Sequence, residues 1–364
     1  MCIGLYNIPV HNVFYDLSPI AQEEWLELMD IAKKHGVKYL FFESISKLPA
    51  ELQPPAALHM QWYVETVKAE ERFSNYKNNI EQLAALFAQN GLPMMLIKGY
   101  SIAQLYPVPA RREGGDIDIF LFGKQQQGEL IIAELYGNGH LKTKGMRSKH
   151  SQFFFNGIGV DNHINFVKDT SGLTPKLEIF YGRIESIIQN AISEKNIETI
   201  KIGEQTIYAL NPNTAALYLT THLFRHISIN ATAIRHFCDW VVFFNYYRNS
   251  FDRELLLQQI EECGLSKFVA NVEAFCQERL MFEPYFAFGN KYEIVTGKRL
   301  IEHVVLNFSQ KLIGNKTISI VKKSLSKMLS SQRCYAEYLG LTNYFDYFIP
   351  NVLARIKQLV TLKF

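Results

Sequence analysis

Cysteine is scarce and scattered in this chain. The 364 residues include five cysteines, an odd number, and none of them forms a Cys-x-x-Cys pair. A zinc or redox site built on closely spaced cysteines is therefore not indicated. We expect reduced thiols that pack as small apolar side chains, as in an intracellular protein.

Long apolar runs and an export signal are also missing. Hydrophobic residues make up 48% of the chain, but no window reaches the ~18 uncharged apolar residues that a membrane-spanning helix needs. The N-terminus lacks a basic segment followed by an apolar core. The sequence predicts a cytoplasmic protein without a transmembrane segment.

No excess of one charge is present. The formal net charge is +3 at pH 7, and charged residues account for 20% of the chain. A surface that coats nucleic acid needs many cations facing phosphates. The near balance argues against nucleic acid as a partner, although it leaves room for a local basic cluster.

The order of the sequence patterns predicts an α+β protein in three parts. Apolar residues recur at three- and four-residue spacing in the N-terminal part and again after residue 211, which is typical of helices. Short apolar runs and turns lie between them. We expect an N-terminal helical region at 1–90, a core with a small sheet at 91–210, and a C-terminal helical region at 211–364.

Short apolar segments of the central part predict its strands. Residues 94–97 end at a Lys-Gly turn, and residues 116–122 follow a Gly-rich loop and become wholly apolar. Residues 152–155 and 158–166 flank Asn156-Gly157, a dipeptide that supplies the positive φ angles of a type I′ turn. The last two segments are therefore expected to form a hairpin.

The most informative motif is Gly114-Gly115-Asp116-Ile117-Asp118. Alternate side chains of a strand share a face, so Asp116 and Asp118 project together while the isoleucines enter the core. Two carboxylates about 7 Å apart can converge on two divalent ions about 3.5 to 4 Å apart. A solvated edge strand also fits Asp-x-Asp alone, but the buried continuation of this strand favours a ligand at its mouth. Gly115 allows the backbone to approach that ligand closely.

Residues before this motif offer contacts for phosphate. Lys98-Gly99 lies between a strand and a short helix, where free N–H groups favour an anion, although an ordinary turn also accounts for it. Lys98 would add a charge and Ser101 a hydroxyl. One of the two arginines at 111–112 can clamp a phosphate, while the other pairs with a neighbouring acid or solvent.

A third carboxylate is available on the second strand of the hairpin. Asp161 and His163 lie on one face of this strand and Asn162 on the other. Asp161 is the only acid in residues 158–166. If the strands are adjacent, it would complete a site of three acids.

Together these motifs resemble a bacterial family of uncharacterised nucleotidyltransferases, a branch of the DNA polymerase beta-like nucleotidyltransferase superfamily. The resemblance covers roughly residues 20–245 and consists of the Lys-Gly turn, a short helix reaching a Tyr-Pro, an arginine, Gly-Asp-Ile-Asp and Val-Asp-x-His. It implies a small mixed-sheet nucleotidyltransferase core that uses Mg²⁺, with two ions, and a nucleoside triphosphate (NTP). The implied catalytic metal ligands are Asp116, Asp118 and Asp161. The implied nucleotide-binding residues are Lys98, Gly99, Ser101, Arg112, Gly115 and His163.

The reaction that the resemblance implies is transfer of a nucleoside monophosphate to a hydroxyl of an unidentified small molecule, sugar or protein. The alternative is a non-catalytic nucleotide-binding or scaffold protein with the same fold. Addition of nucleotides to RNA would require a basic groove. Three intact acids favour the enzyme, because a cluster of like charges is costly without a metal.

Two further features leave their roles open. His140 to His150 contains four lysines and arginines and no acid, which fits a lid over a triphosphate or a solvated loop. His222 and His226 share a helix face, and Arg235 and Asp239 are expected on the next helix. Metal binding, hydrogen bonding between helices, and lining of the nucleotide or acceptor pocket are all compatible with this pattern.

Overall fold

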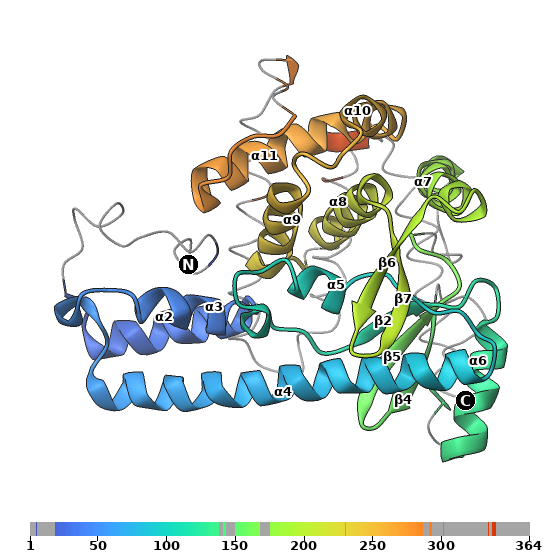
Figure 1. Cartoon of the computed structure of the whole chain (residues 1–364). Helices are drawn as coiled ribbons and strands as arrows, with labels where there is room; N and C mark the ends of the chain where they lie inside the picture. The colour runs from blue at the N-terminus through green and yellow to red at the C-terminus, as the bar shows by residue number, and fades with distance from the viewer. Residues whose placement is uncertain are drawn as a thin grey trace, which may run out of the picture.

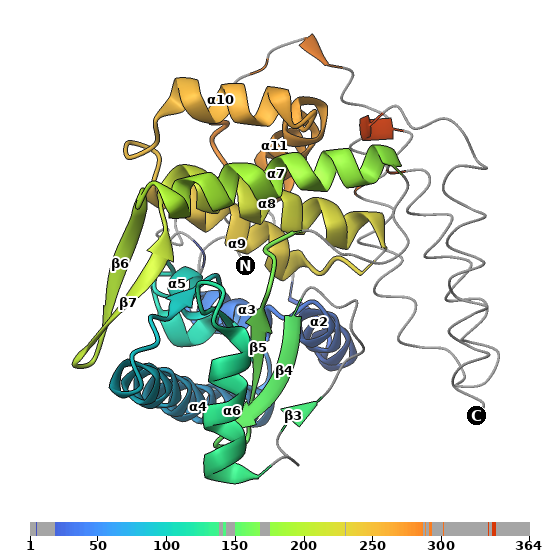
Figure 2. The same cartoon turned by 90° about the vertical axis from the view of Figure 1, so that its right-hand side faces the viewer.

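A computed structural model of the chain describes residues 19–137, 150–167, 175–229 and 231–286, the backbone of Leu141–Lys142, and residues 5, 288, 291, 292, 301, 334 and 337–339. A mixed sheet lies between the long helix α4 and a group of C-terminal helices (Figures 1 and 2). The expected α+β fold, with helices before and after a small mixed sheet, is confirmed. Nearly all of the basic segment 140–150, and most of the chain beyond residue 286, lie outside the described residues.

Helices precede the sheet, as the spacing of apolar residues predicts. They are α2 (Gln22–Lys34), α3 (Lys38–Ile45), a 3-10 turn (Ala50–Leu52) and α4 (Ala56–Gln89). Pro55 is the N-cap of α4, in keeping with the restricted φ angle that favours proline where a helix begins. Figure 1 shows α4 running along one side of the sheet. Its residues Ile80, Leu83 and Phe87 are fully buried there.

The sheet has seven strands in the order β3-β4-β5-β2-β1-β7-β6. The strands are β1 (Met95–Leu96), β2 (Ile117–Phe120), β3 (Leu141–Lys142), β4 (His150–Phe155), β5 (Ile158–His163), β6 (Ile197–Ile202) and β7 (Gln205–Leu210). The pairs β2–β5 and β1–β7 are parallel, and the other pairs are antiparallel. The sheet is therefore mixed, as the resemblance implies.

The two faces of the sheet enter different cores, and this positions the acids. Ile117 and Ile119 of β2 belong to the apolar cluster with α4 and α6 (Gln125–Tyr136). Phe120 belongs to the cluster on the opposite face, with the C-terminal helices. Because side chains alternate along a strand, Asp118 lies on the same face of the sheet as Phe120, the face that is covered by those helices.

One hairpin of the sheet was predicted and one was not. Asn156 and Gly157 have φ angles of 47° and 80°, which confirms the predicted turn between β4 and β5. The hairpin of β6 and β7 was not predicted from the sequence, although Gly203 at its two-residue turn has a positive φ of 57°. Helix α6 ends at Tyr136, and Gly137 after it has a positive φ of 80°.

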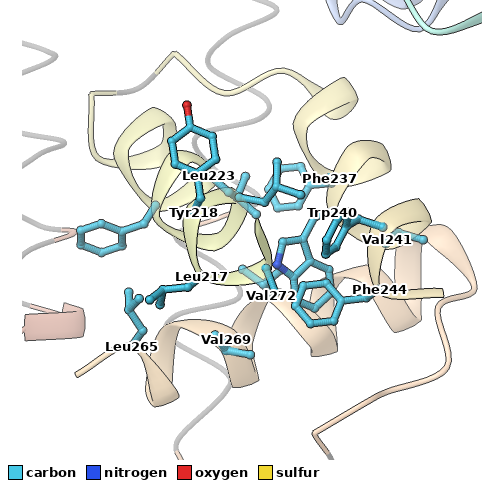
Figure 3. Close-up of a cluster of buried hydrophobic side chains, with 14 of the residues drawn as sticks. Leu217, Tyr218, Leu223, Phe237, Trp240, Val241, Phe244, Leu265, Val269 and Val272 are labelled. Atoms are coloured by element: carbon cyan, nitrogen blue, oxygen red, sulfur yellow. The ribbon is translucent and has the colours of Figure 1, made fainter. Parts of the chain in front are cut away.

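The C-terminal helices pack on one another and on the sheet. They are α7 (Pro175–Ser193), α8 (Pro212–Ser228), α9 (Ile234–Tyr246), α10 (Arg253–Glu262) and α11 (Ser266–Leu280). Asn211 caps α8 by accepting a hydrogen bond from the N–H of Thr214, and Pro212 occupies the first turn. Figure 3 shows the core between these helices, with Trp240 and Phe244 of α9 among its largest side chains. Within the described ranges, no helix combines the length and hydropathy that a membrane span requires.

Candidate functional site

Three carboxylates meet on neighbouring parallel strands. Asp118 on β2 pairs in register with Asp161 on β5, and Asp116 immediately precedes β2. One oxygen from each of the three acids lies within 4.8 Å of the others. Asp116 is exposed, whereas Asp118 is only 2% exposed. The structure thus brings together the three acids that the resemblance implies as metal ligands.

Asp118 is held by a cation and a histidine. Nζ of Lys98 donates to Oδ2 at 2.6 Å, and Nε2 of His163 lies 3.0 Å from Oδ1. Burial raises the pKa of Asp118, but Lys98 and the hydrogen bond from His163 outweigh burial and hold the pKa well below its usual value. Asp118 is therefore ionised at neutral pH. Lys98, predicted as a phosphate contact, contacts this carboxylate.

Asp161 has a different environment from Asp118. Nε2 of Gln152 donates to its Oδ1 at 2.7 Å, and Nε2 of His150 lies 3.2 Å from its Oδ2. Burial raises the pKa of Asp161, and the charges of Asp118 and Asp116 raise it further. Asp118 and Asp116 thus repel the charge of Asp161, as expected for a cluster of like charges.

The turn before the acids depends on a glycine and a tyrosine. Gly99 has a φ of 77° and precedes the single-turn helix α5 (Tyr100–Ala103). The hydroxyl of Tyr76 on α4 donates to the carbonyl oxygen of Asp116 at 2.8 Å. A Cβ atom at Gly99 would lie only 2.8 Å from that hydroxyl oxygen. Gly99 is therefore required both for its backbone angle and for space, and Tyr76 was not foreseen as a residue of the site.

A cavity extends from Asp116 and Asp118 to the C-terminal helices. Its wall on the sheet side contains Lys98, Gly99, Ile102, Arg112, Gly114, Gly115, Asp116 and Asp118. Its wall on the helix side contains Leu219, His222 and Leu223 of α8 and Arg235, His236 and Asp239 of α9. Of the predicted site residues, all of which are described, Ser101, Asp161 and His163 do not line this cavity.

Arg112 and Asp239 form an ion pair across the cavity wall. Nε and Nη2 of Arg112 donate to the two carboxylate oxygens of Asp239 at 2.8 and 2.9 Å, and the hydroxyl of Tyr106 donates to Oδ1 at 2.7 Å. Burial raises the pKa of Asp239, but Arg112 outweighs burial and lowers it overall. Arg112 thus lines the cavity, but its guanidinium binds Asp239 through two hydrogen bonds. This network ties the loop before the acids to α9.

Three histidines of α8 and α9 cluster beside the cavity. One ring nitrogen from each of His222, His226 and His236 lies within 4.8 Å of the others. However, Nδ1 of His236 accepts a hydrogen bond from the N–H of Ala233 at 3.1 Å, so neutral His236 carries its proton on Nε2. Coordination through Nε2 would place a proton on Nδ1, against that N–H. The sequence left three hypotheses open for these histidines. The geometry favours lining of the pocket, since His222 and His236 line the cavity.

The fold and the site define a class. A small mixed sheet that carries Asp-x-Asp on one strand and a third aspartate on the adjacent parallel strand is the arrangement implied for a nucleotidyltransferase core. The model of the uncharacterised nucleotidyltransferase family matches residues 21–281, more than half of the chain. The protein therefore belongs to this family, and the resemblance read from its motifs is confirmed. Neither a curated protein nor a solved structure matches the chain.

Proposed function

We propose that the protein transfers a nucleoside monophosphate from an NTP to a hydroxyl group of an acceptor, with Asp116, Asp118 and Asp161 as the ligands of Mg²⁺. The observation that carries this proposal is the convergence of the three carboxylates from the β2 and β5 region within 4.8 Å. Mg²⁺ prefers carboxylate oxygens, so the donor set fits this cation. When bound by these acids, two Mg²⁺ ions would supply Lewis-acid chemistry, lowering the pKa of the acceptor hydroxyl and stabilising the negative charge of the leaving pyrophosphate.

The protein's own residues would orient the acids for this reaction. Lys98 and His163 each hold one oxygen of Asp118, and Gln152 holds one oxygen of Asp161. Tyr76 holds the backbone of Asp116. Such fixed ligands reduce the reorganisation needed when charge develops on the transferred phosphoryl group.

The nucleotide would lie against the loop after β1 and the loop before β2. We propose nucleotide contacts for Lys98, Gly99, Ser101, Arg112, Gly115 and His163. The cavity wall formed by α8 and α9 would then face the nucleotide or the acceptor. In this scheme residues 91–210 form the catalytic core, and the helical regions 1–90 and 211–364 support it. The need for NTP is consistent with a cytoplasmic location.

Titration calorimetry with each of the four common NTPs, in Mg²⁺ and in chelator, tests the proposal. We expect Mg²⁺-dependent binding of at least one NTP, and loss of that binding in Asp116→Asn and in Asp118→Asn. Asp30→Asn, which changes an exposed acid on α2, is the matched control and should bind like the wild type. Absence of NTP binding by folded wild-type protein would overturn the proposal.

A non-catalytic nucleotide-binding or scaffold protein is the second candidate. It is favoured by the engagement of both oxygens of Asp118, one by Lys98 and one by His163. Pyrophosphate release from the bound NTP, with a small-molecule extract as the source of acceptors, separates the two. Release that Asp116→Asn abolishes supports the enzyme, whereas binding without release supports the scaffold.

A further inference from the structure

Two ion pairs form among the charged residues of the cavity wall, and one cation, Arg235, and one acid, Asp116, stand outside them. The wall contains the cations Lys98, Arg112 and Arg235 and the acids Asp116, Asp118 and Asp239. Lys98 is paired with Asp118, and Arg112 is paired with Asp239. Within the described part of the chain, Arg235 forms no ion pair.

The side chain of Arg235 is nevertheless held in place. Its Nη1 donates to the carbonyl oxygen of Glu113 at 2.9 Å. Its methylene groups pack beside Gly36, since a Cβ atom added at that glycine would lie 3.4 to 3.6 Å from them. Its Nε is buried and has no hydrogen-bond partner among the described residues. A guanidinium has five N–H donors, and the bond from Nη1 to Glu113 uses one of them, so donors of Arg235 are left for an anion in the cavity that it lines.

Neither Glu113 nor Asp239 forms an ion pair with Arg235 among the described residues, although burial raises the pKa of both acids and the charge of Arg235 acts to lower it. Glu113 directs its carboxylate Oε1 to the N–H of Lys38 at 2.8 Å and offers Arg235 only its carbonyl oxygen. The N–H groups at the start of α9 are already bonded, to Nδ1 of His35 from Ile234 and to the carbonyl of His35 from Arg235. The N–H groups of Ile234 and Arg235 thus already have acceptors. At this end of α9, the guanidinium of Arg235 is therefore the group that we expect to bind a ligand.

We infer that Arg235 forms an oxyanion subsite in the cavity that contains Asp116 and Asp118, and that it takes a phosphoryl or carboxylate group. A guanidinium binds both through the same planar geometry. The inference deepens the proposed function, on which it rests for the role of the subsite in the reaction. Two sources of the oxyanion share this chemistry, namely the phosphates of the NTP and an acidic group on the acceptor.

Binding of inorganic pyrophosphate in chelator tests the subsite without the metal. We expect the wild type to bind pyrophosphate and Arg235→Gln to bind it at least tenfold more weakly, with Arg235→Lys in between. Arg279→Gln, which changes an exposed arginine on α11, is the control and should bind like the wild type. Thermal melting of each variant separates loss of binding from loss of folding. Equal binding by Arg235→Gln and the wild type, or no binding by the wild type, would overturn the inference.

A competition experiment in Mg²⁺ distinguishes the two sources. If the NTP displaces pyrophosphate and Arg235→Gln also weakens NTP binding, the subsite takes the donor phosphates. If pyrophosphate still binds at saturating NTP, the subsite takes an anionic acceptor. The proposed function can fail without the subsite. In that case the wild type would show no Mg²⁺-dependent NTP binding but would still bind pyrophosphate in chelator, and Arg235→Gln would bind it more weakly.

Discussion

Nζ of Lys98 lies 2.6 Å from Oδ2 of Asp118, within a cavity wall where Asp116 has no such cation. Two acids that are two residues apart on one motif thus differ in their electrostatic surroundings. This difference gives opposite expectations for stability when either acid is replaced by its amide.

Asp118→Asn should destabilise the protein in the absence of metal. The substitution leaves the largely buried ammonium of Lys98 without its counter-charge, and breaking a buried pair costs about 3 to 5 kcal/mol. Asp116→Asn removes an exposed acid that raises the pKa of Asp161 by repulsion, so the free energy of unfolding should stay the same or rise. Urea denaturation in chelator measures both. An equal loss in the two variants would contradict the ion-pair argument.

Binding of Mg²⁺ should release protons at pH values near and below the raised pKa of Asp161, because a ligand carboxylate must be ionised. Burial, followed by Asp118 and Asp116, raises the pKa of Asp161 in the folded state. The stability that this acid contributes is therefore present below its unfolded pKa of about 3.9 and lost as pH rises through the raised value. Mg²⁺ affinity should change in the opposite sense and weaken as pH falls through that value.

Calorimetry in buffers of different ionisation enthalpy measures the protons released on Mg²⁺ binding. Asp161→Asn should abolish the release as well as weaken the binding. Proton release that persists unchanged in this variant would assign it to another group.

Arg112 and Asp239 should be coupled in a double-mutant cycle. Arg112→Ala and Asp239→Ala each leave a buried charge unpaired, at a cost of about 3 to 5 kcal/mol. The double variant should lose less than the sum, with a coupling of about 1 to 3 kcal/mol. Tyr106→Phe removes one hydrogen bond to the same carboxylate and should cost about 1 kcal/mol. Additive losses, measured by urea denaturation, would show that the network is not cooperative.

Gly99→Ala should be worse than Gly91→Ala. Both glycines have a positive φ, but a Cβ at Gly99 meets the hydroxyl of Tyr76 at 2.8 Å, whereas nothing lies within 4 Å of one at Gly91. Gly91→Ala should therefore cost only the backbone strain, about 1 to 2 kcal/mol. Gly99→Ala should cost more and should also weaken NTP binding, because Tyr76 holds the carbonyl of Asp116. Similar losses of stability in the two variants would contradict the steric argument.

Much of the site could be predicted because it depends on local periodicity. Alternation along a strand places Ile117 in the core and Asp118 on the other face. The same rule places Asp161 and Asn162 on opposite faces of β5. The Asn156-Gly157 turn was equally readable, since positive φ angles are a local property of these residues. By contrast, β6 and β7 went unrecognised, although the glycine at Gly203 marks their turn.

The sequence by itself determined the acids, the strand faces and the helical character of the flanking regions, because each depends on residues a few positions apart. The tertiary structure decided which acids are neutralised. Asp118 meets Lys98 through the pairing of β1 with β2, and Asp239 meets Arg112 across 127 positions in the sequence. Such partners follow from how α9 and the sheet pack together as whole surfaces, and packing of this kind leaves no periodic signal in either segment. The same packing places Arg235 in the cavity wall, where it forms no ion pair with a described residue and donates to the carbonyl oxygen of Glu113.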